Sequence, residues 1–268
     1  MIGAIAGDIV GSRFEFDNVK TKWFRFFTEQ NCFTDDTVMT CCVAEALRLS
    51  WEKDKFETLD EKTKSIMQGI GQWYPNCGYG AKFIKWMYAE DPQPYDSCGN
   101  GSAMRISPVG DIARSIEEAK ELSYKVTAIS HNHPEGIKGA EAVAVASFLL
   151  RTGHRKNEVK SYVEDHYYDL STSVREYREE IFGHGKEICQ ITVPQAFACF
   201  FEGYSYRDVI RNCMSIGGDS DTIGAIAGGL AESFYGAPDK VKYGAMSYLD
   251  GWLYEIVLDF EQFRKDFA

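Results

Sequence analysis

The hexapeptide Ile2-Gly3-Ala4-Ile5-Ala6-Gly7 recurs letter for letter as Ile223-Gly224-Ala225-Ile226-Ala227-Gly228. Each copy places small residues at helical spacing, so two buried helices could approach closely, because glycine and alanine lack side-chain bulk. The flanks of the two copies do not match, which argues against a tandem repeat. A phosphate-binding loop is the other interpretation, but neither copy fits the Walker pattern and a dinucleotide-binding fold would need flanking strands. We therefore expect the two hexapeptides to form a tightly packed helix pair.

Helical periodicity also dominates the rest of the chain. Apolar residues recur at helical spacing in most segments, for example from Ala140 to Leu150, from Val193 to Phe201 and from Tyr248 to Phe260. Strand signals are weak, since few stretches alternate β-branched or aromatic residues with polar ones and no Asn-Gly or Asp-Gly turn joins two such runs. Glycine and proline clusters mark short loops, none of them long enough to link two domains. The periodicity predicts a mainly helical protein.

Length and charge limit the classes of function. The chain has 268 residues, long enough to bury most of its apolar surface without help from metals or disulfides. With 29 basic and 40 acidic residues its formal charge is −11, which discourages contact with nucleic acid or anionic membranes. We expect neither as a partner. An anionic substrate would need local compensation from cations or backbone amides.

Cysteine usage and the first residues bear on the cellular compartment. The eight cysteines contain no Cys-x-x-Cys pair, and we expect reduced and mostly buried thiols. The N-terminal segment lacks a basic region and Asp8 breaks its apolar run, unlike a signal peptide. No apolar run approaches the length of a membrane span. These features predict a cytoplasmic protein.

Two short acidic clusters each precede a helical run. Thr34-Asp35-Asp36-Thr37 and Gly217-Gly218-Asp219-Ser220-Asp221-Thr222 could each be a helix cap with charges that suit the positive end of a helix. A cap explains one aspartate well, but neighbouring carboxylates repel each other and a cation relieves that repulsion. The second cluster is not an EF-hand, because Ile223 and Leu230 would occupy ligand positions. Together the clusters offer only hard oxygen ligands, which select magnesium, manganese or calcium over zinc.

Two further loops carry polar groups. The small residues from Cys98 to Arg105 lead into a helix, and their amides could bind an anion or a ribose hydroxyl, although a plain turn is an equal explanation. His131 and His133 alternate before Pro134, but no third zinc ligand lies at a usual spacing. We interpret this second loop as a polar segment facing a cleft.

In chain order, six motifs resemble those of the ADP-ribosylglycohydrolase family, which includes the bacterial dinitrogenase reductase-activating glycohydrolase and the eukaryotic ADP-ribosyl-acceptor hydrolases. The resemblance extends to about Gly236, and six ordered motifs are far more specific than any one alone. The motifs are Gly7-Asp8 with Gly11 and Glu15-Phe16, Phe33-Thr34-Asp35-Asp36-Thr37, Gly78-Tyr79-Gly80, Gly99-Asn100-Gly101-Ser102-Ala103-Met104-Arg105, Ser130-His131-Asn132-His133-Pro134 and Gly217-Gly218-Asp219-Ser220-Asp221-Thr222.

The resemblance implies an all-α, single-domain orthogonal helical bundle over residues 1–268, with a binuclear magnesium or manganese site in a cleft. Glu15 would be a catalytic acid or base on a mobile segment, with Asp35 and Asp36 also catalytic. The implied metal ligands are Thr34, Asp35, Asp36, Asp219, Asp221 and Thr222. The residues implied at the substrate are Tyr79, Gly99, Asn100, Gly101, Ser102, Met104 and His131.

The implied activity is hydrolysis of the glycosidic bond between the distal ribose of ADP-ribose and an acceptor. ADP-ribosylated protein or a related conjugate would be the substrate, and ADP-ribose the product. The acceptor stays open among arginine, serine, an acetyl group, a nucleic-acid base and another ADP-ribose unit. Two other classes are a non-catalytic binding or structural relative, which would be expected to lack the ligand residues, and an immunity or regulatory protein that blocks an ADP-ribosyltransferase.

The chain departs from the family pattern in two places. Ala231-Glu232-Ser233 stands where relatives usually have Ala-Gly-Ala, and we expect this to be a surface change. The charged segment between Ser50 and Gly78 has no recognisable counterpart. We expect that segment to shape the rim that selects the leaving group.

Overall fold

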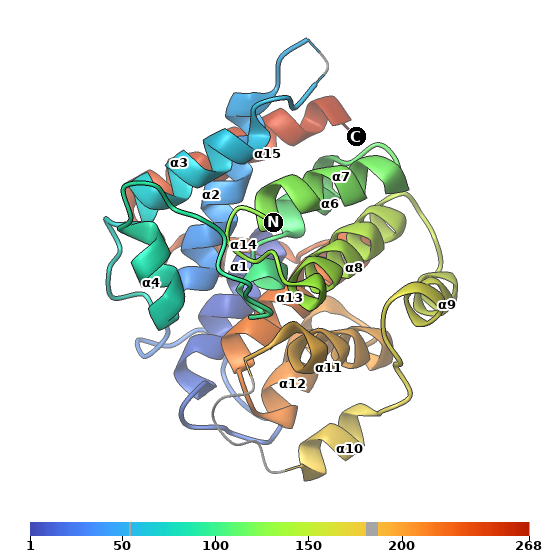
Figure 1. Ribbon diagram of the computed structural model, residues 1–268. Coiled ribbons are helices and arrows are strands. Elements are labelled where there is room, and N and C mark those ends of the chain that lie inside the picture. The colour runs from blue at the N-terminus through green and yellow to red at the C-terminus, as the bar shows by residue number, and fades with distance from the viewer. Residues whose placement is uncertain (54, 181–186, 268) are drawn as a thin grey trace.

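The computed structural model describes residues 1–53, 55–180 and 187–267, which form a bundle of helices (Figure 1). No strand occurs in these ranges, and the two isolated bridges pair Glu52 with Lys55 and Gly99 with Ile188. The all-α prediction is confirmed. The helices are α1 (Ile2–Gly11), η1 (Ser12–Phe14), α2 (Asp35–Ser50), α3 (Leu59–Gly71), α4 (Ala81–Met87), α5 (Gly101–Met104), α6 (Ser107–Ile112), α7 (Ile116–Thr127), α8 (Pro134–Arg151), α9 (Lys156–His166), α10 (Val174–Glu179), α11 (Cys189–Glu202), α12 (Tyr206–Ile216), α13 (Ser220–Tyr235), α14 (Asp239–Met246), α15 (Gly251–Phe263) and η2 (Arg264–Phe267).

Helices α1 and α13, which contain the two hexapeptides, pack directly on each other. A Cβ atom on Gly7 would lie 1.9 Å from the carbonyl oxygen of Gly224, and one on Gly3 would lie 2.6 Å from that of Gly228. Backbones this close leave no room for a side chain, so glycine is required at the crossing. The packing interpretation of the repeated hexapeptide is confirmed.

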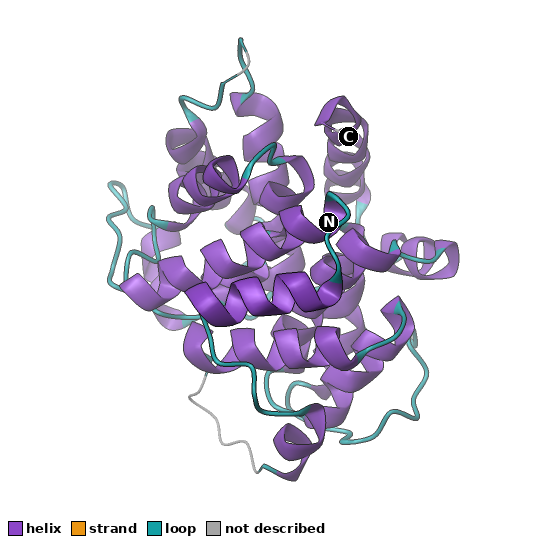
Figure 2. Cartoon of the chain, turned by 90° about the vertical axis from the view of Figure 1, so that its right-hand side faces the viewer, coloured by secondary structure: helices purple, strands orange, loops and turns teal. Residues whose placement is uncertain are grey.

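The remaining helices surround this pair. Helix α13 also contacts α8, α11 and α12, while α2 packs against α3 and α15 on the other side of α1. The view in Figure 2 shows helices that cross one another in different directions, as in an orthogonal bundle. Helices α1 and α13 are buried along almost their whole length, and the first turns of α2 and α13 are also largely buried.

Glu232 is buried, so the expectation of a surface change at this position is wrong. Its Oε2 atom accepts hydrogen bonds from the backbone N–H of Gly3 (2.7 Å) and from the amino group of Met1 (2.9 Å). Burial raises the pKa of this carboxyl group, but the neighbouring amino group and Arg264 lower it by more. Residue 232 follows Gly224 and Gly228 at intervals of four, which puts all three on the face of α13 that meets α1.

All eight cysteines are unpaired, and five of them (Cys41, Cys42, Cys189, Cys199 and Cys213) are buried. This agrees with the prediction of mostly buried thiols. In the part of the chain that the structure describes, the helices are too short or too polar to cross a membrane.

Candidate functional site

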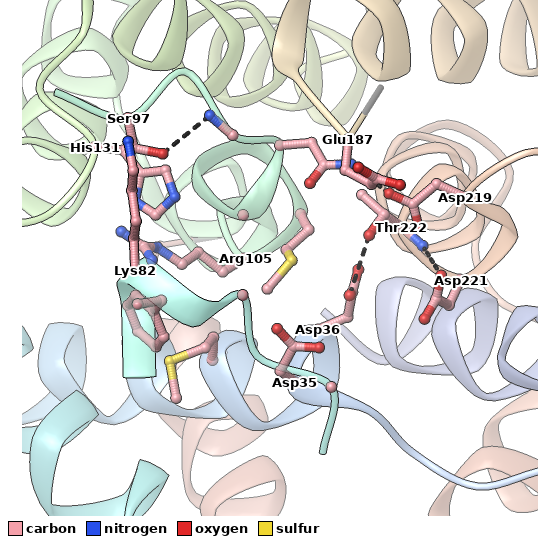
Figure 3. Close-up of a pocket in the computed structure, with 18 of the residues that line it drawn as sticks. Asp35, Asp36, Lys82, Ser97, Arg105, His131, Glu187, Asp219, Asp221 and Thr222 are labelled. Carbon is pink, nitrogen blue, oxygen red and sulfur yellow. Dashed lines mark hydrogen bonds between the residues drawn. The ribbon is translucent and has the colours of Figure 1, made fainter. Parts of the chain in front are cut away.

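A cavity of about 480 Å³ lies beside the first turns of α2, α5 and α13. This volume is typical of pockets that hold a small molecule. Figure 3 shows carboxylates along one side of the cavity, whereas Lys82, Arg105 and His131 lie on the other side. The cavity therefore has an acidic half and a half with cationic and imidazole side chains.

The first turn of α2 is fixed by a side chain from α1. Asp8 accepts hydrogen bonds from the backbone N–H of Thr34 (3.0 Å) and from its hydroxyl (2.8 Å). It also accepts from the backbone N–H of Thr37 (3.1 Å) and from the Thr37 hydroxyl. Thr34 in turn caps α2, because its hydroxyl accepts from the N–H of Asp36 (3.3 Å). The first acidic cluster is thus a helix cap that also presents two carboxylates to the cavity.

The start of α13 brings the second acidic cluster to the same cavity. The Thr222 hydroxyl donates to Oδ2 of Asp36 across a distance of 3.2 Å, which joins the two clusters directly. Asp219 accepts a hydrogen bond of 2.5 Å from the side-chain amide of Asn100. The two clusters, far apart in sequence, are one group of side chains in the folded protein.

Glu15 reaches the cavity from a third element, immediately after η1. One oxygen each from Glu15, Asp219 and Asp221 lie within 4.8 Å of one another, a spacing that could hold a metal ion. Burial, and then the charge of Asp219, raise the pKa of Glu15 to about 7. The family resemblance gave Glu15 a catalytic role and did not include it among the metal ligands, whereas the structure places it inside this compact group.

Burial raises the pKa values of Asp35, Asp36 and Asp221 well above the ordinary value of a carboxyl group. The charge of Asp8 raises the first two further, and that of Asp219 raises the third. In the described part of the chain, Oδ1 of Asp36 is buried without a hydrogen-bond partner. Crowded, buried carboxylates of this kind fit divalent cations that prefer hard oxygen ligands, such as magnesium or manganese.

The opposite half of the cavity centres on His131. Its Nδ1 atom lies 2.8 Å from the Ser130 hydroxyl, which accepts a hydrogen bond from Arg105 (2.9 Å). Burial, and then the charge of Arg105, hold the pKa of His131 well below its ordinary value, so the ring is neutral. The hydroxyl hydrogen of Ser130 is free to bond Nδ1, which leaves Nε2 as the protonated donor. Added Cβ atoms on Gly101 and Gly99 would lie 3.3 Å and 3.5 Å from Nε2, so this donor faces the glycine-rich loop.

Most of the side chains singled out from the sequence line this cavity, and three do not. The residues that line it are Glu15, Asp35, Asp36, Gly99, Asn100, Gly101, Met104, His131, Asp219, Asp221 and Thr222. Thr34 is the N-cap residue of α2, and its side chain accepts a hydrogen bond from the backbone N–H of Asp36. Tyr79 is buried against Phe83, with 5.7 Å between ring centroids. The Ser102 hydroxyl donates to the carbonyl of Gly136 (2.9 Å).

Several lining residues were not assigned to the site from the sequence. They are Met39, Gly78, Gly80, Ala81, Lys82, Phe83, Tyr95, Ser97 and Glu187. Helix α4 begins directly after the Gly78-Tyr79-Gly80 motif. This position beside a motif is the feature of the sequence that could have identified the residues in the first turn of α4. None of the described residues from 51 to 77 lines the cavity, and α3 packs on α2 instead. Ala81, Lys82 and Phe83 of α4 line the cavity, whereas the described part of the charged segment before α4 does not.

Asp8 was also missed as a site residue, although it does not line the cavity. Two sequence signals pointed to it, its place in the Gly7-Asp8 motif and its position as a single acidic residue inside an otherwise apolar helix. A buried carboxylate needs several hydrogen-bond donors, and here the cap of α2 supplies them. Asp8 therefore positions the first acidic cluster without itself lining the cavity.

Comparison with known proteins agrees with this architecture. Residues 1–262 match the family described as ADP-ribosylglycohydrolase. The chain is 25% identical to the ADP-ribosylhydrolase ARH3 of Gallus gallus over 76% of this chain and 70% of that protein. It is also 25% identical to the ADP-ribosyl-[dinitrogen reductase] glycohydrolase of Rhodospirillum rubrum, over 85% of this chain and 76% of that protein.

A solved structure shares the fold. It is described as an ADP-ribosylglycohydrolase-related protein complex, and its chain superimposes with a TM-score of 0.70 at 19% sequence identity. The similarity covers 98% of this chain and 97% of the solved one. With the family match over residues 1–262, these findings show that the chain belongs to the ADP-ribosylglycohydrolase family.

Proposed function

We propose that this protein hydrolyses the glycosidic bond between the distal ribose of ADP-ribose and an acceptor, and so reverses ADP-ribosylation. The observation that carries the proposal is the hydrogen bond of 3.2 Å between Thr222 and Asp36, which unites two distant acidic clusters in one cavity. Family membership supports the reaction class. The name of the Rhodospirillum rubrum relative, which refers to a modified protein, supports an ADP-ribosylated protein as substrate.

The acidic half of the cavity would hold two divalent cations, Mg²⁺ or Mn²⁺. Its ligands would come from Asp35, Asp36, Asp219, Asp221 and Thr222, whose oxygens suit these metals. When bound, the cations would supply positive charge and Lewis acidity toward the hydroxyl groups of the distal ribose. The Thr34 hydroxyl already donates to the buried carboxylate of Asp8. Thr34 would therefore act as the N-cap of α2 that orients Asp36 instead of as a metal ligand.

The other half of the cavity would bind the diphosphate. Lys82 and Arg105 supply positive charge in an otherwise acidic protein, and Nε2 of His131 would donate a hydrogen bond. The glycines at 99 and 101 leave the loop free of side chains where the imidazole approaches it. A substrate whose diphosphate lies in this half of the cavity would place its distal ribose over the carboxylates of the acidic half.

Glu15 would transfer the proton in this reaction. It enters the cavity from the segment after η1, separate from the two helix starts that carry the other acidic residues. Hydrolysis of a glycosidic bond passes through an oxocarbenium-like transition state, in which one carboxylate activates water or protonates the leaving group. Held beside Asp219 and Asp221, the Glu15 carboxyl would exchange a proton with water or with the departing acceptor.

The test is release of ADP-ribose by the purified chain. Substrates linked through arginine, serine and an acetyl group would each be incubated with Mg²⁺, Mn²⁺ or a chelator, and ADP-ribose would be measured by mass spectrometry. We expect release from at least one substrate, dependent on the cation and abolished in Asp36→Asn and Asp221→Asn. The exposed change Asp165→Asn on α9 is the matched control and should retain activity. Full activity after exhaustive chelation would refute the role of the metals, and no release from any substrate would refute the hydrolase.

A further inference from the structure

One side chain, Asn18, fastens the segment that carries Glu15 to the turn before Asp219. Its Nδ2 atom donates to the carbonyl oxygens of Phe14 (2.6 Å), Glu15 (3.1 Å) and Gly218 (3.2 Å). Its Oδ1 atom accepts from the backbone N–H of Gly218 at 2.7 Å. Only one orientation of the amide satisfies all of these groups, because the carbonyls need a donor and the N–H needs an acceptor.

The turn at Gly217 and Gly218 has a backbone conformation that accommodates the Asn18 amide. Gly217 and Gly218 both have positive φ angles, of 76° and 81°, in the region that favours glycine. A Cβ atom on Gly217 would lie 2.7 Å from Oδ1 of Asn18, so a side chain at this position would displace the Asn18 amide. The Asn18 amide thus pairs with both polar backbone groups of Gly218, the residue immediately before Asp219.

The hydrogen bonds of Asn18 oppose a repulsion between the two segments that they join. Glu15 lies on one segment, and Asp219 and Asp221 lie on the other, with one oxygen of each carboxylate within 4.8 Å of the others. Like charges at this separation push the segments apart unless a cation lies between them. A residue that fixes both backbones keeps the three carboxylates together before a cation arrives.

We propose that Asn18 is a positioning residue that holds the Glu15 carboxylate beside Asp219 and Asp221, where its negative charge attracts cations to the site, and that through Glu15 it sets the affinity for divalent cations. The inference rests on the metal site of the proposed function. It concerns the apo protein as well as the loaded one, because the hydrogen bonds of Asn18 involve only protein groups. An alanine at this position removes every one of these bonds and leaves the carboxylates unchanged.

The experiment measures Mn²⁺ binding by isothermal titration calorimetry, without substrate, for the wild type, Asn18→Ala, Glu15→Gln and the double variant. Loss of the Asn18 bonds should raise the dissociation constant about tenfold, the effect of one or two net hydrogen bonds. In the Glu15→Gln background the same change should have little further effect, because the two residues act through one interaction. Asn157→Ala, at an exposed position of α9, is the matched control and should bind as the wild type does.

Hydrogen exchange provides a second readout that needs no metal. Backbone amides of residues 12–18 and of Gly218 should exchange faster in Asn18→Ala, while those of the buried helix α8 should not change. Unaltered Mn²⁺ affinity in Asn18→Ala, or an equal loss in the Glu15→Gln background, would overturn the inference and leave the proposed function intact. A wild type that binds no Mn²⁺ would instead refute the metal site itself, and the inference with it.

Discussion

At the scale of single residues, the buried carboxylate of Asp8 decides where the first acidic cluster lies. Two backbone N–H groups and two hydroxyls, all from Thr34 and Thr37, donate to it. Burial raises the pKa of Asp8 to about 6, and these hydrogen bonds limit the rise. The same carboxylate therefore anchors α2 to α1 and adds negative charge behind the cavity.

Asp8→Asn should lower the free energy of unfolding. The amide of asparagine has one acceptor oxygen, so some of the four donors lose their partner, at about 1–3 kcal/mol for each buried unsatisfied group. Relief of repulsion with Asp35 and Asp36 offsets part of this loss, and we expect a net decrease of about 2 kcal/mol. Urea unfolding at pH 7 measures the change. Asp165→Asn on α9 is the control, and equal unfolding midpoints for the two variants would contradict the anchoring role.

Glu15→Gln should stabilise the metal-free protein in a way that depends on pH. The pKa of Glu15 is raised from 4.5 to about 7 in the folded state, so its ionisation disfavours folding. Below pH 4.5 both states are protonated and nothing is lost, whereas stability falls as the pH rises from 4.5 through 7. Since Glu15 is partly exposed, solvent screening limits the gain from glutamine at pH 8 to about 1 kcal/mol.

Thermal unfolding of both proteins in chelator, at pH 4.5 and at pH 8, tests this expectation. The variant should unfold at a higher temperature than the wild type at pH 8 and at nearly the same temperature at pH 4.5. A constant difference between the two pH values would show that the Glu15 carboxyl does not titrate as its surroundings predict.

At the scale of elements, the crossing of α1 and α13 carries the architecture of the site. Asp8 lies on α1 and Asp221 and Thr222 lie on α13, so the distance between these helices sets the distance between the acidic groups. The helices meet glycine to glycine, where a Cβ on Gly7 would lie 1.9 Å from the carbonyl oxygen of Gly224. Separation of the helices by even one methyl group would therefore widen the proposed metal site.

Gly7→Ala should destabilise the protein by about 3 kcal/mol or more, because overpacking a rigid core forces the backbones apart. Gly69→Ala on α3 is the matched control, since nothing lies within 4 Å of the Cβ it would add. In a helix interior that second change should stabilise by about 0.5–1 kcal/mol through helix propensity. Urea unfolding distinguishes the two, and similar behaviour of both variants would show that the helix contact tolerates side chains.

At the scale of the whole molecule, an acidic protein gathers six of its carboxylates around one cavity. The formal charge is −11, and six acidic side chains line one cavity. Their mutual repulsion is a cost to the folded state that divalent cations would remove. Stability and the proposed metal binding should consequently be coupled in this protein.

Saturating Mg²⁺ or Mn²⁺ should raise the unfolding temperature by about 5 °C at pH 8, since a cation at 100 times its dissociation constant contributes about 2.7 kcal/mol. The shift should be smaller at pH 5, where protons compete for carboxyl groups whose pKa values are raised. Differential scanning fluorimetry measures both shifts. NaCl at equal ionic strength is the control, and an equal shift with NaCl would indicate general screening instead of binding.

The sequence by itself determined the helical class, the close packing of the two hexapeptides and most of the polar residues that line the cavity. These features follow from local patterns, because helical periodicity, small residues and ordered motifs are all visible in the linear chain. Lys82, Tyr95 and Glu187 could not be found in this way, since each lines the cavity only because its element folds against it. Whether Asp36 and Thr222 meet, whether Glu232 is buried and which amide holds Glu15 were decided by the tertiary structure alone. The physical reason is that hydrogen bonds and burial depend on distances across helix crossings, and those distances arise only when the core has packed.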